Sequence, residues 1–166
     1  TADRDDHPSK AVEHLEKAGE LAPSLDPPNW ELAADAHLHR GAILSRSSKR
    51  RQEAIEDFRA GLGFAEKGSG QNIEQSRRQL RQQLAQALMK SDDFYKAKEH
   101  LDKLVSDAKV DDSSKAWAYS ALAQVHARKG NHEKAKAALE AGLPLAQRAG
   151  DDDLVETFKE NLKKFE

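Results

Sequence analysis

A pattern of small and aliphatic residues recurs four times along the chain, and it limits the possible folds more than any other feature. Within each copy the residues are four, three and four positions apart, which places them on one face of an α-helix. The copies start 43, 43 and 38 residues apart. This period predicts a stack of helical pairs instead of a single globular core. The four copies are Ala11, Leu15, Ala18, Ala22; Ala54, Phe58, Gly61, Ala65; Ala97, Leu101, Leu104, Ala108; and Ala135, Leu139, Gly142, Ala146.

Composition supports a helical protein and narrows the functional classes. Alanine, leucine, glutamate and lysine favour helices and are frequent, whereas the strand-favouring valine and isoleucine are scarce. The 27 basic and 29 acidic residues nearly balance, so the chain lacks a strong basic field for nucleic acid. It has no cysteine, and no apolar run approaches the roughly 20 residues that span a bilayer. We expect no nucleic-acid partner, no membrane insertion and a cytoplasmic location.

A second type of helix precedes three of the four copies. Its third pattern position always holds a small residue, either Gly41, Ala85 or Ala123. Two helices of a hairpin need small residues where they cross, because their axes lie only about 8–10 Å apart. The alanine that opens each following helix would supply the facing small residue. The three sets are His37, Arg40, Gly41, Leu44; Arg81, Leu84, Ala85, Leu88; and Tyr119, Leu122, Ala123, His126.

The alternation of these two helix types resembles the tetratricopeptide repeat family. The resemblance covers about residues 30–148, with half a repeat before them, and it is most specific in the last repeat. His37 and Arg81 occupy positions where the family usually has an aromatic residue. The resemblance implies an all-α fold, a right-handed α-solenoid of antiparallel helix pairs. The matching residues of the last repeat are Tyr119, Leu122, Ala123, Gly130, Ala135 and Leu139.

The turn and breaker signals divide the chain into four parts. We expect a flexible N-terminus at 1–7, a half-repeat helix and linker at 8–28, three helical hairpins at 29–148 and a capping helix at 149–166. The half-repeat would expose an apolar face, so either further repeats precede it, which we favour, or another chain covers it. The expected helices span 8–22, 29–46, 50–67, 71–91, 93–109, 113–129, 132–148 and 152–164.

The family resemblance also implies where a partner would bind. The first helices of each pair line the concave face of the stack, and members that bind chaperone tails place lysine, asparagine and arginine there. Those positions here hold Leu38, Ala42, Gln82, Gln83 and Gln86, so we expect no such carboxylate clamp. Trp117 is either an anchor for the partner or buried against the next repeat. The partner-binding candidates are Leu38, Gln79, Gln82, Gln86, Met89, Trp117, Ser120, Gln124 and Arg128.

We find no convincing catalytic, metal-binding or cofactor-binding motif. His37 and His39 face different sides of a helix, and His126 and His132 flank a turn without further ligands. We therefore expect a non-enzymatic scaffold or adaptor that binds another protein, as a peptide or a helix. Two alternatives remain: self-association through the exposed terminal helix, and a regulatory domain of an enzyme or transcription factor. The basic stretches 46–51 and 76–81 are solvated charge or docking sites for an acidic partner.

Overall fold

The structure is a computed structural model that describes residues 6–165, with side chains from residue 9 onward. It is helical, and no strand occurs among these residues. Two compact units divide the chain at Ala87 and Leu88. Helix α4 ends the first unit and extends into the second. The elements are α1 (Asp6–Leu21), η2 (Ala22–Ser24), α2 (Trp30–Leu44), η3 (Ser48–Arg50), α3 (Arg51–Lys67), α4 (Gln71–Lys90), α5 (Phe94–Ser106), α6 (Asp112–Arg128), α7 (His132–Ala149), α8 (Asp152–Leu162) and η4 (Lys163–Phe165).

The expected helices are present, with ends that differ by a few residues. Helix α1 begins at Asp6, two residues earlier than expected. Pro8 is tolerated there, because backbone nitrogens in a first helical turn need no helical hydrogen-bond partner. Residues 1–5 of the expected flexible segment lie outside the described residues. Polar connection residues cap several helices: the side chains of Asn29, Asp111 and Asp151 accept hydrogen bonds from backbone amides three residues later.

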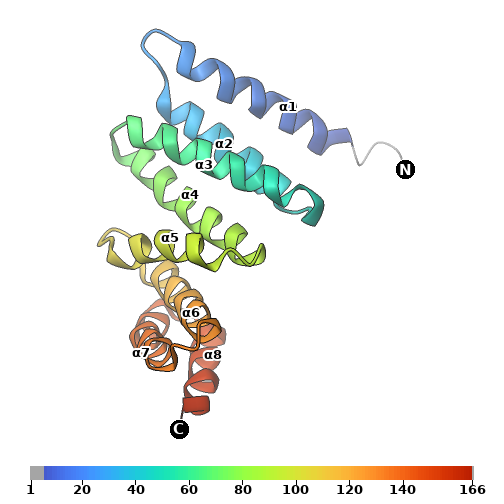
Figure 1. Cartoon of the computed structure of the whole chain (residues 1–166). Coiled ribbons are helices and arrows are strands. Elements are labelled where there is room, and N and C mark those ends of the chain that lie inside the picture. The colour runs from blue at the N-terminus through green and yellow to red at the C-terminus, as the bar shows by residue number, and fades with distance from the viewer. Residues whose placement is uncertain (1–5, 166) are drawn as a thin grey trace. The chain divides into compact units, whose positions relative to one another are not determined.

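Helices α1, α2 and α3 lie side by side in the first unit (Figure 1). Contacts between α1 and α2 join Gly19 to His37 and Glu16 to Arg40, so residue numbers rise on one helix as they fall on the other. This order identifies an antiparallel pair. At Gly41 a side-chain carbon would lie 2.6 Å from the ring of Phe58, which shows how closely α2 and α3 cross. The small residue expected at this crossing is therefore required by packing.

Helix α4 runs parallel to α2 across the face of α3. Asn72 donates a hydrogen bond to Glu31 at 3.1 Å, and the hydroxyl of Ser76 donates one to Asp35 at 2.5 Å. In each of these two hydrogen bonds the partners are 41 positions apart in the sequence, so α2 and α4 run in the same direction. Leu80 lies against Gly61 of α3. The first unit thus repeats one arrangement: successive helices are antiparallel and alternate helices are parallel.

A buried carboxylate connects the first three helices. The side chain of Asp57 on α3 is 1% exposed and accepts a hydrogen bond from His37 Nδ1 at 2.9 Å. The guanidinium of Arg40 donates to both oxygens of Asp57 and also pairs with Glu16 of α1. Burial alone would raise the pKa of Asp57, but the hydrogen bonds from His37 and Arg40 outweigh it and hold that pKa below its usual value.

Helices α5 to α8 form the second unit. Arg148 near the end of α7 binds Asp112 at the start of α6 through two hydrogen bonds, at 2.8 and 3.1 Å, so this pair is antiparallel. Phe158 of α8 is fully buried, and Gly142 of α7 lies directly against its ring. Helix α8 therefore covers the α6–α7 pair. The all-α fold class, an α-solenoid of antiparallel helix pairs, is confirmed.

Candidate partner-binding site

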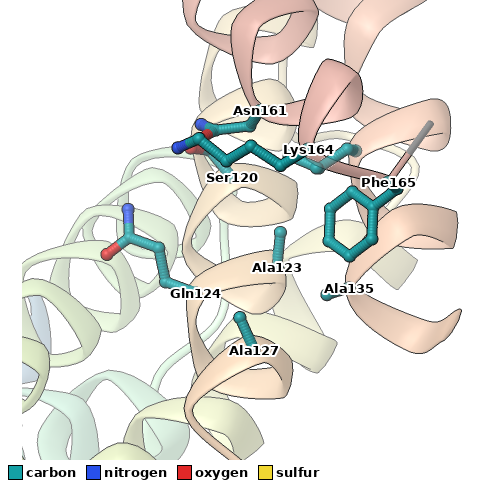
Figure 2. Close-up of a pocket in the computed structure, with 9 residues that line it drawn as sticks. Ser120, Ala123, Gln124, Ala127, Ala135, Asn161, Lys164 and Phe165 are labelled. Atoms are coloured by element: carbon teal, nitrogen blue, oxygen red, sulfur yellow. The ribbon is translucent and has the colours of Figure 1, made fainter. Parts of the chain in front are cut away.

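A pocket of about 170 Å³ lies in the second unit between α6, α7 and the end of α8 (Figure 2). Small apolar residues form its floor. Polar side chains from α6 and α8 stand at its edge, and the ring of Phe165 from η4 closes one side. Its lining residues are Ser120, Ala123, Gln124, Ala127, Ala135, Leu139, Asn161, Lys164 and Phe165.

The pocket exists because α6 and α7 contact each other through alanines, while the main contact of α8 with α7 lies at another part of the pair. Ala123 and Ala135 are buried at the crossing, where the sequence predicts small residues. At the other end of the same pair, Phe158 of α8 fills the space beside Gly142. Among the described residues, no comparable side chain fills the space above the two alanines, because α8 ends at Leu162 and the chain turns into η4. Two short side chains facing each other therefore leave a hollow.

The edge of the pocket carries hydrogen-bonding groups. The ammonium of Lys164 donates to the side-chain oxygen of Asn161 at 2.7 Å. Figure 2 shows the Lys164 side chain extending toward Ser120, while the ring of Phe165 is turned toward Ala135. Gln124 is exposed, so its amide can donate to and accept from an incoming backbone.

The volume of the pocket decides which ligand class it suits. Pockets for small molecules and cofactors usually measure about 300–1,000 Å³. An apolar cavity of about 150 Å³ holds one benzene molecule. At about 170 Å³, this pocket matches a single aliphatic or aromatic side chain. The arrangement suits an anchor residue of another protein, with amide and ammonium groups beside it for the flanking backbone.

The structure brings some of the predicted binding residues of the second unit together. Ser120 and Gln124 line the pocket, although Ser120 is largely buried. Trp117 lies on the same face of α6, one turn before Ser120, and is half-buried. Arg128 lies apart from the pocket: its guanidinium binds Asp92 at 3.3 Å and covers the ring of Phe94 at 4.4 Å.

The other candidates differ in how much surface they offer. Leu38 is 7% exposed, so this side chain serves mainly in packing. Gln79 is exposed, whereas Gln82 and Gln86 on the same helix are half-buried. Met89, at the start of the second unit, is also half-buried. That these residues and those of α6 lie on one concave face stays a prediction.

Sequence reasoning missed the contribution of the C-terminal turn. Asn161, Lys164 and Phe165 were expected only as parts of a cap. The available signal was the apolar stripe of Leu154, Phe158, Leu162 and Phe165, because Phe165 continues it beyond the end of α8.

The histidines whose side chains the structure describes show no metal-binding arrangement. Among the side chains of residues 9–165, no three histidine, aspartate or glutamate residues gather in a way that could hold a metal ion. Burial lowers the pKa of His126, and the nearby ammonium groups of Lys98 and Lys134 lower it further. The ring nitrogen Nδ1 of His126 is buried without a hydrogen-bond partner.

The sequence of the last repeats identifies the family. Residues 77–148 match the family model described as tetratricopeptide repeat. This segment carries tetratricopeptide repeats. The matched segment includes α6 and α7, which supply the pocket floor, and leaves out the α8 cap. No curated protein matches the chain. In the described part of this repeat protein, every helix is too short or too polar to cross a membrane.

Proposed function

We propose that this tetratricopeptide repeat chain is a non-enzymatic scaffold or adaptor that binds an extended segment or helix of another protein at the α6–α8 pocket. The pocket itself is the observation that supports the proposal: one apolar hollow of side-chain size, bordered by amides. Repeats of this family serve protein–protein interaction and are not catalytic. Trp117 and Gln124 extend the site along α6, and a location in the cytoplasm remains a prediction.

The pocket is held in a fixed shape before a partner binds, and this supports it as a binding site. Phe158 is buried beside Gly142, and Arg148 is clamped to Asp112, so α6, α7 and α8 are fixed to one another. A rigid pocket loses little conformational entropy when a partner binds. The apolar floor supplies affinity, and the hydrogen-bonding edge orients the partner's backbone.

Filling the pocket from within tests the proposal. Ala127→Leu places extra volume in the pocket from an exposed position of α6, where leucine suits the helix. Peptides selected on the wild-type protein from a random library serve as probes. Burying one large apolar side chain contributes about 1.5–3 kcal/mol, so we expect Ala127→Leu to weaken binding by about tenfold or more.

Ala137→Leu is the matched control, because Ala137 is exposed on α7 and lies outside the pocket. We expect it to change the affinity by less than about twofold. Circular dichroism should show the same helix content in both variants. Equal affinities of the two variants for every selected peptide would mean that the pocket takes no partner side chain.

Self-association remains a second candidate for one specific reason. Leu21, Leu25 and Leu32 at the connected end of the α1–α2 pair are 62%, 50% and 43% exposed. Exposed leucines at one place favour contact with an apolar partner, which could be a second copy. Light scattering during size-exclusion chromatography separates the two candidates, since the adaptor function needs only a monomer.

A further inference from the structure

A second pocket lies in the first unit, at the end of the α1–α2 pair. It has a volume of about 320 Å³ and is formed by α1, the end of α2 and the connection to α3. Its floor is aliphatic: Leu44 is buried, and Val12 and Ile43 are half-buried. Arg46 and Arg50 stand at its rim, together with the hydroxyls of Ser9 and Ser47.

The connection that carries the basic rim is an ordered turn. The backbone amides of Arg46 and Ser47 donate to carbonyls in the last turn of α2, at 3.3 and 3.1 Å. The amide of Arg50 then donates to the carbonyl of Ser47 at 3.1 Å. Successive hydrogen bonds of this kind fix the direction in which the basic side chains leave the backbone. The backbone of the turn is therefore preformed, which lowers the entropic cost of binding.

Arg46, Lys49 and Arg50 lie at this turn, and two of the three form no ion pair with a described residue. Arg50 is paired with Glu53 through two hydrogen bonds, at 3.0 and 2.7 Å. Arg46 and Lys49 are exposed, and neither takes part in an ion pair within the part of the chain that the structure describes. Arg46 at the pocket rim, and Lys49 three residues further along the same turn, therefore carry charges that no described carboxylate neutralises.

We propose that this surface, formed by Val12, Ile43, Leu44, Arg46 and Lys49, docks an acidic protein segment that carries an aliphatic side chain. The aliphatic side chain enters the pocket, and neighbouring carboxylates pair with the guanidinium of Arg46 and the ammonium of Lys49. The proposal is independent of the α6–α8 pocket, because every residue belongs to the first unit. It gives the chain two separate docking surfaces.

The apolar floor argues for a protein segment over nucleic acid. A phosphate backbone would use the cations but not a floor of valine, isoleucine and leucine. The chain as a whole carries a net charge of −2, so it lacks the overall positive charge that favours binding to nucleic acid. Both parts of the surface are used only by a ligand that is acidic and aliphatic at once.

A fluorescent synthetic peptide, EEDLEDLEE, tests the proposal by anisotropy with the full chain. We expect binding that weakens with added salt, as exposed ion pairs do. Arg46→Glu with Lys49→Glu should weaken binding by about tenfold or more, because two attractions become repulsions. Val12→Ala with Ile43→Ala should also weaken it, and the peptide EEDSEDSEE should bind less tightly than the leucine peptide.

Lys17→Glu with Arg59→Glu is the matched control, since both residues are exposed in the same unit and outside the pocket. It makes the same change in net charge and should alter affinity by less than about twofold. An equal loss in both double variants would overturn the proposal, as would equal binding of the serine peptide. Failure of the leucine peptide to bind, or tighter binding of a single-stranded DNA oligonucleotide, would overturn it as well.

Discussion

Replacing Phe158 with alanine will lower the free energy of unfolding of the second unit by about 3–5 kcal/mol. The side chain is fully buried, and it is the contact that seats α8 on α7. The chain has two tryptophans, one in each unit, so Trp117 fluorescence in a Trp30→Phe background reports this unit during urea unfolding. Phe165→Ala serves as the control, because Phe165 is only half-buried and should cost clearly less.

The same contact predicts an unusual effect at Gly142. In a helix interior, alanine is usually about 1 kcal/mol more favourable than glycine. Here a side-chain carbon would lie 2.4 Å from the Phe158 ring and 2.9 Å from Cβ of Tyr119, so Gly142→Ala should be destabilising by about 1–3 kcal/mol. With Phe158→Ala present, that penalty should shrink by more than 1 kcal/mol. Strictly additive effects would show that the two residues are not in contact.

Asp57→Ala will destabilise the first unit by about 3 kcal/mol. Removing one partner of a buried ion pair usually costs about 3–5 kcal/mol, because the remaining charge is left buried. The lower end applies, since Arg40 keeps its pair with Glu16 and is 21% exposed. Trp30 fluorescence in a Trp117→Phe background measures the effect. Glu66→Ala, an exposed carboxylate on the same helix, should stay within about 0.5 kcal/mol of the parent.

The lowered pKa of Asp57 makes this difference depend on pH in one direction. Its stabilising contribution is complete above the usual aspartate value of 3.8 and is lost as the pH falls through the lower value in the folded state. His37, Arg40 and Glu16 surround the group. The gap in stability between the parent and Asp57→Asn should therefore be constant from pH 7 to 5 and narrow near pH 3. A gap that widens in acid would contradict this assignment.

The repeating part of the fold was predictable because it depends on the spacing of small and apolar residues within each helix. The stripe from Ala135 to Ala146 and the small residues at Gly41 and Ala123 follow from helix periodicity and close crossing. The Asp57 cluster was not predictable in the same way. His37 departs from the aromatic pattern, but nothing in the sequence shows that its partner is a buried carboxylate twenty positions later.

The binding surfaces were predictable only in part. Periodicity places Ser120 and Gln124 on one face of α6, and both line the pocket. Helix periodicity could not predict the α6–α8 pocket, because the pocket depends on where α8 ends relative to Ala123 and Ala135. Burial of Leu38 was missed for a related reason: a helix packed on several sides buries residues outside its main stripe. The basic turn near Arg46 was visible in sequence, but its aliphatic floor needed α1 and α2 to be placed side by side.

Intermolecular nuclear Overhauser effects test the central claim most directly. The sample is the full chain with methyl-labelled alanine, bound to an uncharged peptide selected from the library. If the α6–α8 pocket takes a partner side chain, an apolar side chain of the peptide will show cross-peaks to the methyl groups of Ala123, Ala127 and Ala135. Cross-peaks only to alanines outside the pocket, such as Ala137, would contradict the account.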